Sequence, residues 1–264
     1  MPESVEDKIR TWLAGHGYRF ELIVARAFQR AGFSVTVSEF ACDPESGEPR
    51  EIDVVATHTS FLTRADLFDV TFIIECKHSR DKPWIIFVGG DDIDVTKTTE
   101  LLYRFATKAS RIALLEMSIG EEARQTGLFA LPRKMGHGVR RAFEEKTDLA
   151  YDAVTKVCAG AAGFTAEKEN KMNKFGIVFP VVIIQGQMFE CGINEATEIE
   201  LNEVKQATIF WRRPIADRSI VPVELLTEDV LADFANAKFK QCEALRKIVE
   251  GGLPQTKAAY CSHS

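Results

Sequence analysis

The spacing of apolar residues predicts a helix followed by three strands in the first third of the chain. Between residues 5 and 31, apolar side chains recur every three or four positions, as at Phe20, Val24 and Phe28, and Gly32 follows as a C-terminal stop. Shorter apolar runs predict strands over residues 33–40, 51–58 and 70–76. The polar, proline- and glycine-containing segment DPESGEPR separates the first two strands and is typical of a turn.

The rest of the chain mixes predicted helices with a second group of strands. We expect helices over residues 95–109, 140–160 and 228–249, and strands over residues 177–185, 188–192 and 204–212. The apolar run at 112–115 suits either a strand or a buried helix. The segment Ile177–Gln185 is almost continuously apolar, as in a strand covered on both faces. No repeat or linker interrupts this order, so we expect one elaborated α/β domain over residues 1–264. Its core elements would be about 5–90 and 177–212.

Composition places the chain among ordinary globular proteins. It has 264 residues, of which 45% are hydrophobic and 27% charged. No run approaches the roughly 18 apolar residues of a membrane span, and the acidic, polar start is unlike a secretory signal. Its six cysteines include no Cys-x-x-Cys pair, which favours free thiols over a zinc knuckle or a disulfide framework. We therefore expect a cytoplasmic protein that does not enter a membrane.

Two acidic residues on consecutive predicted strands form the first candidate site. In TFIIECK, Glu75 and Lys77 share one face of a strongly apolar strand, and in EIDVVATH, Asp53 immediately precedes an apolar run. A charge in such a place needs a partner or a metal, because desolvating it alone is costly. Two converging carboxylates suit Mg²⁺ or Mn²⁺, and an adjacent lysine stabilises charge that develops on a phosphate. The alternative is an ordinary salt bridge at a strand end. Glu51 shares the face of Asp53 and is the substitute ligand.

The first predicted helix adds a third carboxylate. At about 100° per residue, the cations of this helix gather on one face, whereas Glu21 lies with Val24, Ala25 and Phe28 on the apolar stripe. Charged side chains are seldom buried without a partner. Glu21 therefore either reaches solvent from the edge of the stripe or points toward Asp53 and Glu75.

This arrangement resembles the PD-(D/E)xK nuclease superfamily. A helix with Glu21, a strand with Asp53 and a strand with Glu75-Cys76-Lys77 look most like its Mrr-like branch, although Ile52 replaces the proline of the motif. The resemblance covers roughly residues 15–90. It implies a restriction endonuclease-like mixed central sheet flanked by helices, with helical and strand elaborations after residue 90.

The resemblance also implies roles for these residues. Asp53, Glu75 and the main-chain carbonyl of Cys76 would ligate Mg²⁺ or Mn²⁺. Lys77 would position the attacking water or stabilise the transition state. Glu21 would complete the site, directly or through a metal-bound water.

Basic residues gather in two segments although the net charge is −6. An acidic protein does not coat nucleic acid indiscriminately, but a local basic groove suits a phosphate backbone. Candidate nucleic-acid-binding residues are His78, Arg80, Lys82, Arg133, Lys134, Arg140 and Arg141. A solvated polar surface is the alternative for both segments. For Trp84, packing in the core is favoured over stacking on a base.

Together these patterns predict a metal-dependent endonuclease that hydrolyses phosphodiester bonds with metal-activated water. DNA is the expected substrate and RNA the alternative, and the resembled branch suggests restriction or anti-phage defence. Two rivals stay open: a catalytically silent nucleic-acid- or protein-binding module on the same fold, and an effector nuclease gated by a partner or ligand. The oligomeric state stays open: a homodimer is the default for an enzyme that cuts both strands, and a partner protein of a defence system is the alternative.

Overall fold

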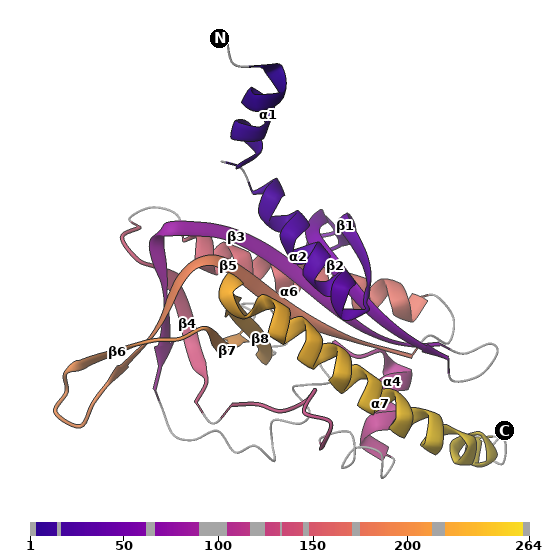
Figure 1. Ribbon diagram of the computed structural model, residues 1–264. Coiled ribbons are helices and arrows are strands. Elements are labelled where there is room, and N and C mark those ends of the chain that lie inside the picture. The colour runs from indigo at the N-terminus through magenta and orange to yellow at the C-terminus, as the bar shows by residue number, and fades with distance from the viewer. Residues whose placement is uncertain are drawn as a thin grey trace.

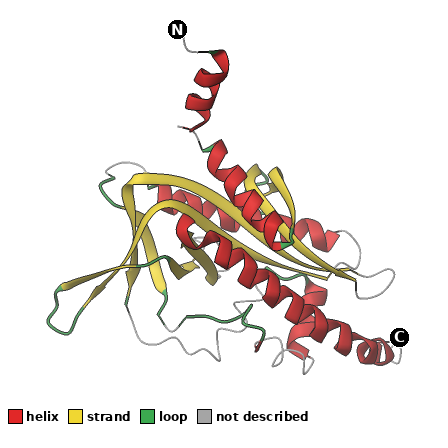
Figure 2. Ribbon diagram, viewed as in Figure 1, coloured by secondary structure: helices red, strands yellow, loops and turns green. Residues whose placement is uncertain are grey.

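The protein is a mixed α/β structure built on one large sheet (Figures 1 and 2). The computed structural model describes residues 4–14, 17–61, 67–89, 105–116, 125–132, 134–144, 148–170, 175–212 and 220–260. The strands in this part of the chain are β1 (Ser34–Cys42), β2 (Pro49–Phe61), β3 (Leu67–Val88), β4 (Gly136–Arg141), β5 (Phe175–Ile193), β6 (Ile199–Glu203), β7 (Gln206–Arg212) and β8 (Ile220–Thr227). The helices are α1 (Val5–Ala14), α2 (Tyr18–Ala31), α4 (Lys108–Glu116), α6 (Leu149–Asn170), η1 (Glu228–Val230) and α7 (Leu231–Tyr260).

The sheet is organised around the long parallel pair β3 and β5. Its eight strands follow the order β1-β2-β3-β4-β7-β8-β5-β6, and β3 also pairs with β5. The first part of β3 lies between β2 and β5, and its last part lies between β4 and β5. Strands β3, β4, β7, β8 and β5 thereby form a closed ring, in which β4 and β7 meet at Gly136 and Ile209.

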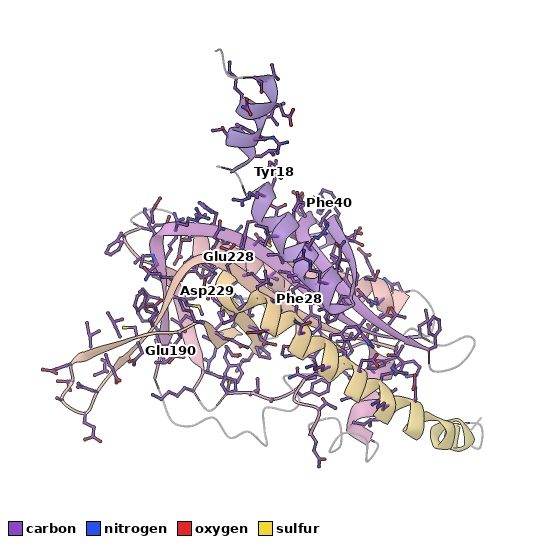
Figure 3. The ribbon with its side chains drawn as sticks, viewed as in Figure 1. Tyr18, Phe28, Phe40, Glu190, Glu228 and Asp229 are labelled. Atoms are coloured by element: carbon purple, nitrogen blue, oxygen red, sulfur yellow. The ribbon has the colours of Figure 1, made fainter. Side chains whose placement is uncertain are left out.

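Two layers of helix cover the sheet. Helices α2 and α7 pack on one face over a cluster that includes Phe28, Phe72 and Phe234, and Figure 3 places Phe28 on the side of α2 near α7. Helix α6 packs on the other face over a second cluster, which includes Ile73 and Val182. Helix α1 projects from the body, as does the β5–β6 hairpin (Figure 1).

The structure confirms much of the predicted order of elements and corrects several boundaries. The predicted helix over 5–31 is two helices, with Gly17 as the N-cap of α2. The predicted helix over 140–160 begins only at Leu149, because residues 136–141 form a strand that pairs with β3. The run at 112–115 lies in helix α4. Residues 95–104 of another predicted helix lie outside the described residues.

The late strands also differ from the prediction. Segments 177–185 and 188–192 are one strand, β5, because parallel pairing with β3 continues on both sides of a local irregularity. Strands β6 and β8 were not predicted. All five residues of β6 are exposed, and Pro222 interrupts the apolar run of β8, so neither has a strong strand pattern. No helix in the described part of the chain is long and apolar enough to cross a membrane.

Candidate active site

The candidate site lies where β2 and β3 separate. Their antiparallel register ends at the pair Val54 and Ile74. Beyond this pair, β2 stays paired with β1 while β3 stays paired with β5. Asp53 and Glu75 are the next residues on the two strands, so the topology puts the two predicted carboxylates on either side of the fork.

The side chain of Asp53 points across this fork. Ile52 and Val55 both belong to the buried cluster beneath α6, whereas Val54 belongs to the cluster on the opposite face, so the faces of β2 do not alternate regularly here. Oδ2 of Asp53 accepts a hydrogen bond from the backbone N–H of Cys76 at 2.8 Å. The Cys76 N–H thus finds an acceptor where β2 and β3 no longer form backbone hydrogen bonds with each other. The bond also fixes the orientation of Asp53, which is only 9% exposed.

Glu75 and Lys77 lie on the α6 side of β3. Glu75 is 2% exposed and lies on the same face of β3 as Ile73, which belongs to the cluster beneath α6. Nζ of Lys77 donates to Oε1 of Glu75 at 2.5 Å. The two residues lie in the middle of β3, not at a strand end as predicted, and form a charge-assisted hydrogen bond with the lysine partly open to solvent.

A second lysine, Lys156 of α6, joins the two carboxylates. Its Nζ lies 3.1 Å from Oδ1 of Asp53 and 3.0 Å and 2.9 Å from the two carboxylate oxygens of Glu75. The sequence analysis did not identify this residue. The available signal was a single lysine within the small and apolar run AVTKVCAGAAGFT, which is where a charge needs a partner across the interface.

Two glycines bring α6 close enough for this contact. A Cβ atom on Gly160 would lie 3.2 Å from Cγ1 of Ile52, and one on Gly163 would lie 2.4 Å from the carbonyl oxygen of Cys42. Residues 156, 160 and 163 share a helix face by their spacing of four and three. The helix therefore approaches the sheet at the glycines and presents Lys156 to the fork one turn earlier.

Glu21 lies on α2, on the opposite side of the sheet, and interacts with the same carboxylates through its charge. It is half-buried, beside the buried residues Val24 and Ala25. Burial raises the pKa of Glu21, and the negative charges of Asp53, Glu51 and Glu75 raise it further, while Lys156 opposes them. The carboxylate of Glu21 thus lies within electrostatic range of the fork. Glu51 itself is exposed.

The buried groups of the site influence one another's protonation. Burial raises the pKa of Glu75, as does the charge of Asp53, although Lys77 and Lys156 pull it down. Burial lowers the pKa of Lys156, but the two carboxylates outweigh this effect and raise it. Burial also raises the pKa of the Cys76 thiol well above its usual range, so this side chain is an inert apolar neighbour.

The site fits a divalent cation only in part. Among the described residues, no three His, Cys, Asp or Glu side chains form a group ready to hold a metal ion. The contacts of Lys156 nevertheless show that oxygens from Asp53 and Glu75 converge on one point. Hard carboxylate oxygens are the donors that Mg²⁺ and Mn²⁺ take. The two strand residues therefore fit such an ion once the ammonium group of Lys156 has moved aside.

Several predicted basic residues gather beyond Lys77, where the register of β3 against β5 shifts between Ser79 and Trp84. His78 and Arg80 are exposed there, and His78 bonds through Nδ1 to Oε1 of Gln185 at 2.6 Å. Lys82 donates to the carbonyl of Phe143. The backbone pairing of Trp84 with Arg141 and of Ile85 with Arg140 brings these two arginines of the second basic segment beside this part of β3.

The second basic segment is partly neutralised. Arg141 pairs with Glu144, and Arg140 lies 3.6 Å from Asp148. Lys134 is exposed and has no ion pair within the part of the chain that is described. Arg133 lies outside the described residues.

Trp84 is a core residue and does not reach a ligand. It is 0% exposed and belongs to the buried cluster beneath α6, together with Met188 and Ile209. This position excludes the alternative in which Trp84 stacks on a base.

Comparisons with protein-family models, curated protein sequences and solved structures found no match to the chain.

Proposed function

We propose that this protein is a metal-dependent nuclease with a restriction endonuclease-like core. The observation that carries the proposal is the meeting of Asp53, Glu75 and Lys77 at the fork between β2 and β3. Two buried carboxylates and a lysine that is partly open to solvent supply hard oxygen ligands and a positive charge within one small volume. This combination suits the hydrolysis of a phosphodiester bond.

In this proposal, each residue has a separate task. Asp53 and Glu75 hold Mg²⁺ or Mn²⁺, with the carbonyl of Cys76 as a further oxygen donor, and the ion supplies Lewis acidity and lowers the pKa of water. Lys77 places its ammonium group where negative charge develops on the phosphate. Glu21 lies on the far side of the fork and orients water there. The amide of Cys76 keeps Asp53 in position.

DNA is the proposed substrate, and RNA is the alternative. His78, Arg80 and Lys82 follow Lys77 directly, so a phosphate backbone that reaches the fork passes these side chains. Arg140 and Arg141 contribute less, because acidic neighbours already neutralise them. A role in restriction or anti-phage defence and a homodimer belong to the same proposal, whereas an effector nuclease gated by a partner or ligand is a rival to it.

A plasmid-nicking assay tests the proposal. The full chain is incubated with supercoiled DNA in Mg²⁺, Mn²⁺ or EDTA, beside a Lys77→Ala variant. Cutting that requires the metal and is lost in the variant supports the proposed site. Cutting that persists in EDTA, or that the variant retains at the parent rate, places any nuclease activity elsewhere.

A second candidate function is a silent binding module on the same fold. Lys156 favours it, because its ammonium group satisfies both carboxylates without any metal. Calorimetry with Mn²⁺ separates the two functions, since a silent module does not need to bind the ion through Asp53 and Glu75.

A further inference from the structure

We propose that Lys156 is an internal cation that competes with the divalent metal for Asp53 and Glu75 and so sets the metal affinity of the site. This inference rests on the proposed function and adds a means of regulation to it. Lys156 comes from α6, outside the strands that carry the carboxylates.

The contacts of Lys156 define the competition. Its Nζ lies 2.9–3.1 Å from one oxygen of Asp53 and both oxygens of Glu75. Mg²⁺ held by the same carboxylates would need oxygen ligands at about 2.0–2.1 Å. The two cations would therefore occupy overlapping positions. They also repel each other strongly in a buried place, so one must leave before the other binds.

Lys77 does not compete in the same way. Its ammonium group contacts Glu75 at Oε1, while the other oxygen of Glu75 and Oδ1 of Asp53 are both held by Lys156. The second oxygen of Asp53 is taken by the amide of Cys76. Lys156 is thus the one cation in the described site that bridges both proposed ligands.

The ammonium group of Lys156 can leave the carboxylates without movement of α6. Its side chain is 33% exposed at the end of a flexible four-carbon stem, whereas the backbone of α6 is fixed by close packing at Gly160 and Gly163. The ammonium group can therefore exchange the carboxylates for water while the helix stays in place. Before a metal binds, it compensates two carboxylates that would otherwise repel each other.

Mn²⁺ calorimetry on the full chain tests this role, with Lys156→Met beside the parent. We expect the variant to bind Mn²⁺ about tenfold more tightly or better, because the competing charge is gone. Lys205→Met is the matched control, since Lys205 is a surface lysine paired with Glu203 and Asp229 and its loss changes the net charge equally. Lys156→Gln is a second neutral variant in case methionine disturbs packing.

Thermal unfolding provides a readout independent of cutting. In EDTA, Lys156→Met should melt below the parent because the carboxylates lose their counter-ion, and saturating Mn²⁺ should raise its Tm more than that of the parent. Equal Mn²⁺ affinities in the parent and both variants would overturn the proposed competition and leave the nuclease proposal standing. Tighter Mn²⁺ binding by the Lys156 variants, with no DNA cutting by the parent, would support the competition and overturn the nuclease proposal. If no variant binds Mn²⁺, both proposals fall.

Discussion

The amide of Cys76 donates to Oδ2 of Asp53 at 2.8 Å, across the point where β2 and β3 separate. The side chain of Asp53 thereby links the two separating strands, and the same hydrogen bond fixes its orientation. The other oxygen of Asp53 faces Lys156. The bond therefore links the architecture of the sheet directly to the orientation of the proposed metal ligand.

Replacement of Lys77 and of Asp53 should have different effects. Lys77→Ala should reduce DNA cutting by about 10²-fold or more, because it removes charge stabilisation. It should leave the fold intact, since Lys156 still compensates Glu75, and it should leave Mn²⁺ binding intact, because both carboxylates remain. Asp53→Ala should abolish both cutting and Mn²⁺ binding. The measurements are nicking rates and Mn²⁺ calorimetry on the same preparations.

Asp53→Asn is the control that separates structure from chemistry. Asparagine keeps an oxygen that accepts the Cys76 amide, whereas alanine leaves that buried N–H without its partner, at a cost of about 1–3 kcal/mol. We expect Asn to preserve the urea midpoint better than Ala but to lose cutting as completely. Full cutting by the Asn variant would remove Asp53 from the proposed site.

Glu21→Gln should stabilise the protein at neutral pH in EDTA. Burial and the neighbouring carboxylates raise the pKa of Glu21 in the folded state, so its contribution to stability is fully present below the unfolded pKa, about 4.3, and is lost as the pH rises through the folded value. Glutamine avoids this loss. The gain should be largest at pH 7.5 and shrink toward pH 4.5.

Urea midpoints at pH 4.5, 5.5 and 7.5 measure this dependence. Glu198→Gln is a suitable control, because Glu198 is exposed in the turn between β5 and β6 and far from the fork in sequence. A gain for Glu21→Gln that is the same at all three pH values would show that its carboxylate charge is not the cause.

The sequence revealed the strand-borne part of the site because its pattern is local. Asp53 and Glu75 interrupt apolar strands, and a two-residue period fixes the face shared by Glu75 and Lys77. Helical spacing likewise predicted that Glu21 lies on the same face of α2 as its apolar residues. The structure brings Asp53, Glu75 and Lys77 to one fork, while Glu21 acts on it only through its charge, and the chemistry of all four stays a prediction.

The sequence could not reveal Lys156, because its role depends on a distant helix crossing. It is separated from Asp53 by 103 positions, and only the packing of α6 joins the two. Strand β6 was missed for a related reason: it is wholly exposed and is held by pairing with β5. Trp84 had an ambiguous local pattern, and only the three-dimensional fold shows that it is fully buried.

The close approach of α6 predicts unequal costs for alanine at its two glycines. Gly163→Ala should lower the free energy of unfolding by about 1–3 kcal/mol, because the new methyl group would meet the Cys42 carbonyl and force the helix away. Gly160→Ala should cost less than about 1 kcal/mol, since the methyl group meets the side chains of Ile52 and Ile73 at 3.2–3.5 Å, not backbone, and alanine favours the helix.

Urea unfolding measures both values, and Mn²⁺ calorimetry shows whether α6 has moved. A displaced helix withdraws Lys156 from the carboxylates, so Gly163→Ala should also bind Mn²⁺ more tightly if the competition operates. Equal stability of the two alanine variants would show that the backbone contact at Gly163 relaxes without cost.

Helix α6 carries a second ion pair, Lys168 with Asp69, which is buried and does not contact the fork. Nζ of Lys168 lies 2.5 Å from Oδ2 of Asp69, whose other oxygen accepts from the hydroxyl of Thr59 at 2.8 Å. Both charged residues are buried. Lys168→Met should destabilise the fold by about 3–5 kcal/mol, because it leaves an uncompensated carboxylate in the interior.

Asp69→Asn in the Lys168→Met background should recover more than half of that loss, since asparagine removes the buried charge and can still accept from Thr59. Urea midpoints of the two single variants and the double variant complete the cycle. Mn²⁺ affinity should stay at the parent value throughout, because this pair lies twelve residues along α6 from Lys156 and contacts neither Asp53 nor Glu75. A cost below about 1 kcal/mol for Lys168→Met would show that water reaches Asp69 and that the pair contributes no more than a surface salt bridge.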